Sequence, residues 1–73
     1  MTIVGQNKSV AVNYDNLIAI EIHGTYISAH PVTGGSVSPL GLYKDAERTL
    51  EVLGELERKI AFSQDAVYVM PEE

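Results

Sequence analysis

Apolar side chains alternate with other side chains in the first half of the chain. Isoleucines occupy every second position of the segment 17–23, at Ile18, Ile20 and Ile22. A period of two with β-branched side chains predicts a strand that buries one face. Gly24 interrupts the pattern and the segment 25–30 resumes it, so we predict a hairpin that turns near Gly24.

Shorter runs predict another hairpin at the start of the chain. Segments 2–5 and 9–13 are β-prone and flank the turn-like residues 6–8. Residues 14–16 read Tyr-Asp-Asn, and such side chains bond their own backbone in turns. They are therefore expected to connect the two hairpins.

Two further strands are predicted later in the chain. Segment 37–43 follows the glycine loop 31–36, and its Pro39 cannot donate a hydrogen bond, which favours an edge strand or a bulge. Segment 66–70 forms the last strand. Its alternation puts Val67 and Val69 on one face and Tyr68 and Met70 on the other.

The period changes after Asp45. Apolar residues three or four positions apart predict one amphipathic helix. They are Ala46, Leu50, Leu53, Leu56 and Ile60. Asp45 is the predicted N-cap, because its carboxylate can accept hydrogen bonds from the first free amides. Gly54 lowers helix stability by about 1 kcal/mol relative to alanine, and it marks either a close approach of a neighbour or a tolerated imperfection. A loop is expected at 62–65.

These elements predict the fold class. The order β-β-β-β-β-α-β describes a single α+β domain over residues 1–73. One helix is expected to pack on one face of a curved, mostly antiparallel sheet.

Length and composition narrow the possible partners. Seventy-three residues without cysteine bury only about 60% of the unfolded surface and have no disulfide to add stability, so we expect a homo-oligomer. The net charge of −5 disfavours direct nucleic-acid binding and anionic membranes. No signal peptide and no run of about 20 apolar residues is recognised, so a cytoplasmic protein without a membrane span is expected.

Few residues point to catalysis or metal binding. His23 and His30 are the two histidines, and Glu21 precedes His23 by two positions on the same strand face. This trio is a weak metal pattern on sequence grounds, so no metal, cofactor or catalytic residue is predicted. A small hydrolase that uses Glu21, His23 or His30 is kept as an alternative.

The junction before the helix is the predicted ligand site. A helix N-terminus favours an anion, and Lys44 and Arg48 flank it, with the ring of Tyr43 nearby. Asp45 opposes this reading, because it can occupy the free amides itself. Residues from the second hairpin and the glycine loop are expected to join the site across a subunit interface. The full predicted set is Tyr43, Lys44, Arg48, His30, Gly34 and Gly35.

The aromatic content favours association. The chain has four tyrosines, one phenylalanine and no tryptophan. Tyrosine suits interfaces because its ring is apolar and its tip polar, although packing in or around the core is the ordinary role. Tyr26 and Tyr68 are the predicted interface tyrosines.

Three blocks of the chain carry a resemblance. They are Ile3-Val4-Gly5-Gln6-Asn7-Lys8, the stretch LGLYKDAERTLEVLGEL from Leu40, and the ending VYVMPEE. They resemble a family of small uncharacterised proteins encoded in Gram-positive bacteria and their phages or other mobile elements. Its members have L-G-x-Y-x-[ST]-E-E-R-A-x-E-V-L-x-E in the middle and Y-x-M-P-E-E at the end. The departures are Asp45, Ala46 and Thr49. The resemblance implies a phage or mobile-element context and brings no catalytic residue with it.

The main functional hypothesis is a non-catalytic phage or prophage accessory protein that blunts a host defence as an oligomer. It would bind a host defence protein, which predicts an exposed aromatic or acidic face. Alternatively, it would sequester an anionic, nucleotide-like immune signal between subunits. The other hypotheses are a structural or regulatory interaction module unrelated to immunity and the small hydrolase.

Overall fold

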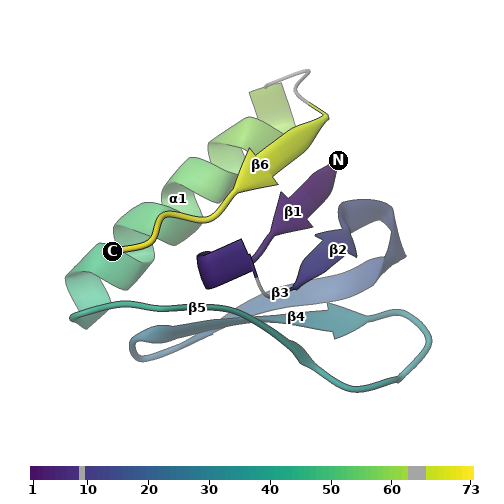
Figure 1. Cartoon of the computed structure of the whole chain (residues 1–73), viewed down its shortest axis with the longest axis horizontal. Coiled ribbons are helices and arrows are strands. Elements are labelled where there is room, and N and C mark those ends of the chain that lie inside the picture. The colour runs from purple at the N-terminus through teal and green to yellow at the C-terminus, as the bar shows by residue number, and fades with distance from the viewer. Residues whose placement is uncertain (9, 63–65) are drawn as a thin grey trace.

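The protein is an α+β fold, as predicted (Figure 1). The computed structural model describes residues 1–8, 10–62 and 66–73. In chain order the elements are β1 (Thr2–Val4), η1 (Gln6–Lys8), β2 (Ala11–Asn13), η2 (Tyr14–Asn16), β3 (Leu17–His23), β4 (Tyr26–Pro31), β5 (Ser38–Leu42), α1 (Ala46–Phe62) and β6 (Val67–Val69), where η marks a 3₁₀ turn. The helix includes Phe62, and the rest of the predicted loop, 63–65, lies outside the described residues.

The described strands form two three-stranded sheets, which corrects the expected single sheet. One sheet has the order β2-β1-β6 and the other β3-β4-β5. Every neighbouring pair is antiparallel except β1 and β6, which run parallel with Ile3 opposite Tyr68. Figure 1 shows these two strands side by side with their arrows in the same direction. Parallel strands need a long connection, and here most of the chain, α1 included, lies between them.

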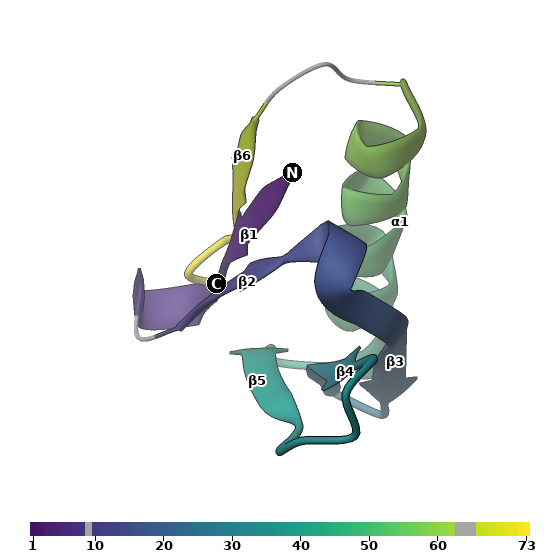
Figure 2. The ribbon, with the colours of Figure 1, turned by 90° about the vertical axis from the view of Figure 1, so that its right-hand side faces the viewer.

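The hydrophobic core lies between the two sheets and the helix. Figure 2 shows α1 and the β2-β1-β6 sheet on opposite sides, with the β3-β4-β5 sheet across one end. The most deeply buried apolar side chains come from all three layers: Ile3, Ile27, Ala29, Leu40, Val52, Leu56 and Met70. The alternation predicted for the last strand is confirmed, because Tyr68 is buried while Val67 and Val69 are exposed.

The helix starts as predicted but buries a rotated stripe. The backbone amide of Arg48 donates to Oδ1 of Asp45 at 2.7 Å, which confirms the N-cap. Thr49, rather than Leu50, faces the core, and its hydroxyl donates to the main-chain oxygen of Asp45 at 2.8 Å. That bond lets a polar side chain be buried without an unsatisfied donor. A Cβ on Gly54 would meet no atom within 4 Å, so Gly54 is the tolerated imperfection.

Strand β3 departs from its predicted alternation at one end. The pairing register between β3 and β4 shifts between Leu17 and Ala19. Leu17 packs against the core after this shift, whereas Ile18 is 74% exposed. The predicted burial of Ile18 is therefore wrong, because the irregularity interrupts the regular alternation at this residue and leaves Leu17 against the core instead.

The turn and edge predictions are confirmed. The β3-β4 hairpin turns at Gly24, which adopts a left-handed φ of 64°. Pro39 lies in β5, at the edge of its sheet and next to a second register shift.

Candidate functional site

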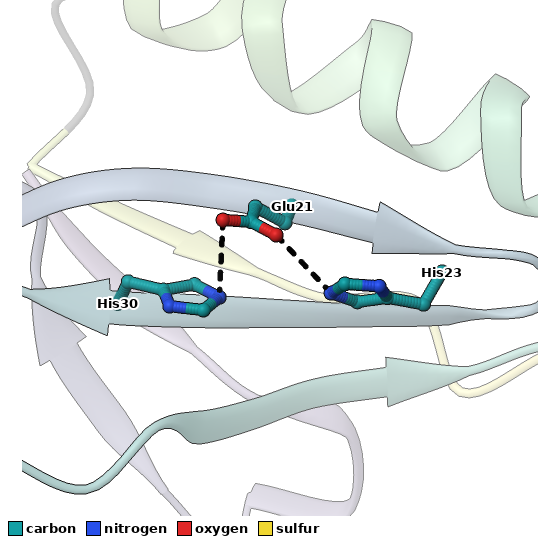
Figure 3. Close-up of side chains that lie close together, drawn as sticks. All are labelled: Glu21, His23 and His30. Carbon is teal, nitrogen blue, oxygen red and sulfur yellow. Dashed lines mark ion pairs between the residues drawn. The ribbon is translucent and has the colours of Figure 1, made fainter.

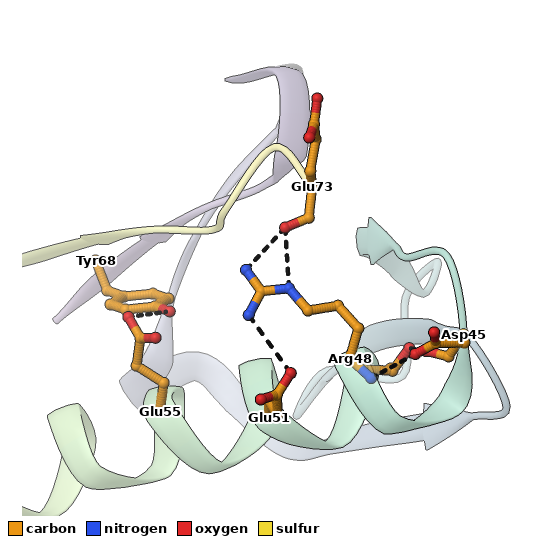
Figure 4. A network of polar contacts seen from close by, with 7 residues as sticks. Asp45, Arg48, Glu51, Glu55, Tyr68 and Glu73 are labelled. Atoms are coloured by element: carbon orange, nitrogen blue, oxygen red, sulfur yellow. Dashed lines mark hydrogen bonds and ion pairs between the residues drawn. The ribbon is translucent and has the colours of Figure 1, made fainter.

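The predicted ligand site at the start of α1 is filled by the chain itself. The guanidinium of Arg48 donates from Nε and Nη2 to the main-chain oxygen of Glu73, at 3.0 and 2.8 Å (Figure 4). Its Nη1 lies 3.9 Å from the carboxylate of Glu51. Since Asp45 also caps the helix amides, an anion would have to displace both Glu73 and Asp45.

Tyr43 packs inside the fold. Its side chain is 5% exposed, and its hydroxyl donates to the main-chain oxygen of Pro71 at 2.9 Å. Burial raises the pKa of this hydroxyl, and Arg48 partly offsets the rise. A Cβ on Gly41 would lie 2.7 Å from the Tyr43 ring, so the ring can occupy this position because residue 41 is glycine. In this conformation the ring has no free face on which a base could stack.

Gln6 completes this junction and was not predicted to have a role. Its Oε1 accepts from the amide of Leu42 at 2.9 Å, and its Nε2 donates to the carbonyl of Leu42 at 3.1 Å. Nε2 also donates to the main-chain oxygen of Glu72 at 2.7 Å. Gln6 thus joins η1, β5 and the C-terminal segment. Residues from all three resembling blocks meet here, so folding explains much of their pattern.

The other predicted ligand residues lie elsewhere in the chain. Lys44 is exposed beside the junction. The amide of Tyr43 donates to the carbonyl of Thr25, in the turn before β4, at 2.9 Å. His30 lies five residues after Thr25, near the other end of β4, which is about 16 Å away at ~3.3 Å per residue. Gly34 and Gly35 follow in an exposed loop. A single chain therefore does not bring the two groups together.

The two proposed interface tyrosines have different surroundings. Tyr68 is 6% exposed, and its hydroxyl donates to Oε1 of Glu55 at 3.2 Å (Figure 4). Burial raises the pKa of Tyr68 well above its usual range, and the neighbouring Glu55 carboxylate raises it further. Tyr26 is half-buried, with its ring centroid 6.4 Å from that of His23. Tyr68 therefore packs within its own chain, whereas part of Tyr26 remains accessible.

Glu21, His23 and His30 meet on one face of the β3-β4 hairpin (Figure 3). Oε2 of Glu21 lies 3.3 Å from Nε2 of His23, and Oε1 lies 3.5 Å from Nε2 of His30. Ser28, which pairs with Glu21 across the hairpin, is buried, and its hydroxyl lies 3.3 Å from Nε2 of His30. The weak pattern in the sequence thus becomes a compact cluster in the structure.

An apolar groove of about 230 Å³ separates β3 from α1. Its apolar lining comes mainly from Leu17, Ile18, Ile20, Leu53, Leu56 and Ile60. Tyr14 and Glu57 add polar atoms to its walls. Ile18, at 74% exposure, is a large apolar side chain in open contact with solvent.

The outer face of the β2-β1-β6 sheet is a second apolar surface. Val67 and Val69 are 52% and 49% exposed, and the register places Val4 beside Val69 on the same face. The amide of Thr2 donates to the carbonyl of Ala66, just before β6, and the amide of Met70, just after β6, donates to the carbonyl of Val4, so the even-numbered residues face β1. The main-chain groups of Val67 and Val69 therefore point to the open edge of the sheet.

No protein-family model, curated protein or solved structure matches this chain. Among the residues that the structure describes, no helix has both the length and the apolar character needed to cross a membrane.

Proposed function

We propose that this protein is a non-catalytic binding protein that holds a partner protein in the apolar groove between β3 and α1. The observation that carries the proposal is the exposed Ile18 beside a concave apolar surface. Burying such a side chain contributes about 1.5–3 kcal/mol, and a few apolar anchors in pockets supply most of the energy of protein interfaces.

The sequence resemblance suggests the class of partner protein. It supports a phage or prophage accessory protein acting in the host cytoplasm, and hence a host defence protein as the target. The charge of −5 and the position of Glu57 at the groove favour a partner with a basic rim around an apolar anchor. Sequestration of a nucleotide-like signal receives less support, because Arg48 and Tyr43 are engaged with the C-terminal segment.

We further propose that the protein acts as a homo-oligomer through the outer face and open edge of the β2-β1-β6 sheet. The main-chain groups at the edge of a sheet readily pair with another strand, and the exposed valines beside them would be covered by the same contact. A second copy that covers Val67 and Val69 would remove both features.

The groove is tested with three untagged chains immobilised on resin and exposed to host lysate. Val32→Asp is the control, because Val32 is 59% exposed and lies outside the groove. Wild type and this control should retain the same host protein. Ile18→Asp should lose it by at least about tenfold, since a buried unpaired carboxylate costs several kcal/mol. Equal retention by Ile18→Asp would contradict the groove as the binding site.

The oligomer is tested by light scattering after size-exclusion chromatography. A dimer would have a mass of about 15.8 kDa, twice the 7.9 kDa of one chain. Val69→Lys should shift the protein towards the monomer mass without loss of helical circular dichroism. A wild-type chain that elutes only as a monomer would remove the oligomer from the proposal but leave the groove untouched.

A further inference from the structure

We infer that Glu21, His23 and His30 form a binding site for one zinc-class divalent cation per chain. The inference is independent of the proposed partner groove. Two imidazole nitrogens and one carboxylate are a common ligand set for zinc, and three protein ligands leave a fourth position open to solvent.

The hairpin fixes the three side chains on a common face. Glu21 pairs with Ser28, and His30 pairs with Ala19. Because side chains alternate along each strand, Glu21 and His23 of β3 share their face with His30 of β4. His30 therefore lies diagonally across from Glu21, while His23 follows it by two positions. This pairing gives the donors a backbone support that loop residues would lack.

The separations between donor atoms are close to those of a tetrahedral site. Zinc binds nitrogen and oxygen at about 2.0–2.1 Å, so two ligands on one tetrahedral ion lie about 3.3 Å apart. Oε2 of Glu21 lies 3.3 Å from Nε2 of His23 and Oε1 lies 3.5 Å from Nε2 of His30, so each histidine is at ligand spacing from one oxygen of the same carboxylate. One donor atom from each residue lies within 4.8 Å of the other two, so the widest separation needs to close by no more than about 1.5 Å.

The surroundings allow that closure. The side chains of Glu21 and His23 are 46% and 55% exposed, so small side-chain rotations meet little resistance. Both histidines direct Nε2 at the same carboxylate (Figure 3). A cation between the three side chains would be bound by Nε2 of each histidine and by the carboxylate of Glu21. The hydroxyl of Ser28 lies 3.3 Å from the same Nε2 of His30, and this contact would be given up when that nitrogen binds a cation.

The experiment is calorimetric titration of the untagged chain with zinc chloride, because a histidine tag would itself bind the metal. Wild type should bind one Zn²⁺ per chain. Glu21→Gln, His23→Asn and His30→Asn should each weaken zinc binding at least about tenfold. Mutation of a residue that only hydrogen-bonds to a metal ligand already lowers metal affinity by about that factor. Glu47→Gln is the matched control, an exposed carboxylate on α1 whose loss should leave zinc affinity unchanged.

A second measurement removes any dependence on how the variants fold. In the wild-type chain, zinc should shift the imidazole NMR signals of both His23 and His30 in a single saturable step. Co²⁺ should then give the visible absorption of a four-coordinate nitrogen–oxygen site. The site would be overturned if zinc failed to saturate, if it shifted one histidine alone, or if it bound the three site variants as tightly as Glu47→Gln.

Discussion

The same substitution, glycine to alanine, is expected to have opposite effects at two positions of this chain. At Gly54, inside α1, an added Cβ meets no atom within 4 Å. Gly54→Ala should therefore stabilise the fold by about 0.8–1.0 kcal/mol, the usual difference between these residues in a helix interior. At Gly41, in β5, the same Cβ would lie 2.7 Å from Cε2 and Oη of Tyr43 and 2.9 Å from Cζ.

The Tyr43 ring cannot easily yield to that contact. Its side chain is 5% exposed, and its hydroxyl is bound to the main-chain oxygen of Pro71. Overpacking of this kind costs about 1–3 kcal/mol, and loss of the hydroxyl bond adds about 0.5–1.5 kcal/mol. A chain of 73 residues has a total stability of roughly 4–11 kcal/mol, so Gly41→Ala should remove a large part of it.

Urea unfolding followed by circular dichroism measures both variants against wild type. Protein concentration must be held fixed, because association adds to apparent stability. In thermal unfolding 1 kcal/mol corresponds to roughly 4–8 °C for a domain of this size, so the two melting temperatures should move in opposite directions. A neutral Gly41→Ala, or a destabilised Gly54→Ala, would show that the packing at these glycines has been misread.

Three further predictions concern stability. Asp45→Ala should lower the free energy of unfolding by about 1 kcal/mol through loss of the helix cap, whereas an unchanged urea midpoint would argue against the cap. Leu56→Ala, in the core, should lower the free energy of unfolding by about 2–5 kcal/mol. Leu50 is 59% exposed, so Leu50→Ala should change that free energy by no more than about 0.5 kcal/mol. Similar losses from the two variants would contradict the observed helix orientation. Finally, the pKa values of Tyr43 and Tyr68 are raised above 10.0 in the folded chain. Their protonated forms then favour the folded state fully below pH 10, and this stabilisation declines above it, where the unfolded chain loses protons first. Urea unfolding between neutral pH and pH 11 should show that decline, and Tyr68→Phe should reduce it; a profile identical to wild type would contradict a role for Tyr68.

The junction at the start of α1 shows how a folding signal can resemble a binding signal. A tyrosine, a lysine and an arginine beside a helix N-terminus predicted an anion site. In the structure, Arg48 holds Glu73 and Tyr43 holds Pro71, both from a segment more than twenty residues later in the chain. These contacts were invisible from the junction sequence alone, because they depend on where the last strand lies.

Sequence alone determined the local features of this protein: the two hairpins, the turn at Gly24, the Asp45 cap and the inward and outward faces of the last strand. Each of these depends on neighbours a few residues apart, where periodicity and turn chemistry decide the outcome. Tertiary structure alone decided how the strands divide into two sheets, because the parallel pairing of β1 with β6 joins opposite ends of the chain. It also decided which residues meet. One residue of register shift exposes Ile18, and the pairing of β3 with β4 brings His30 to Glu21, because side-chain neighbours across a sheet are set by register and not by distance along the sequence.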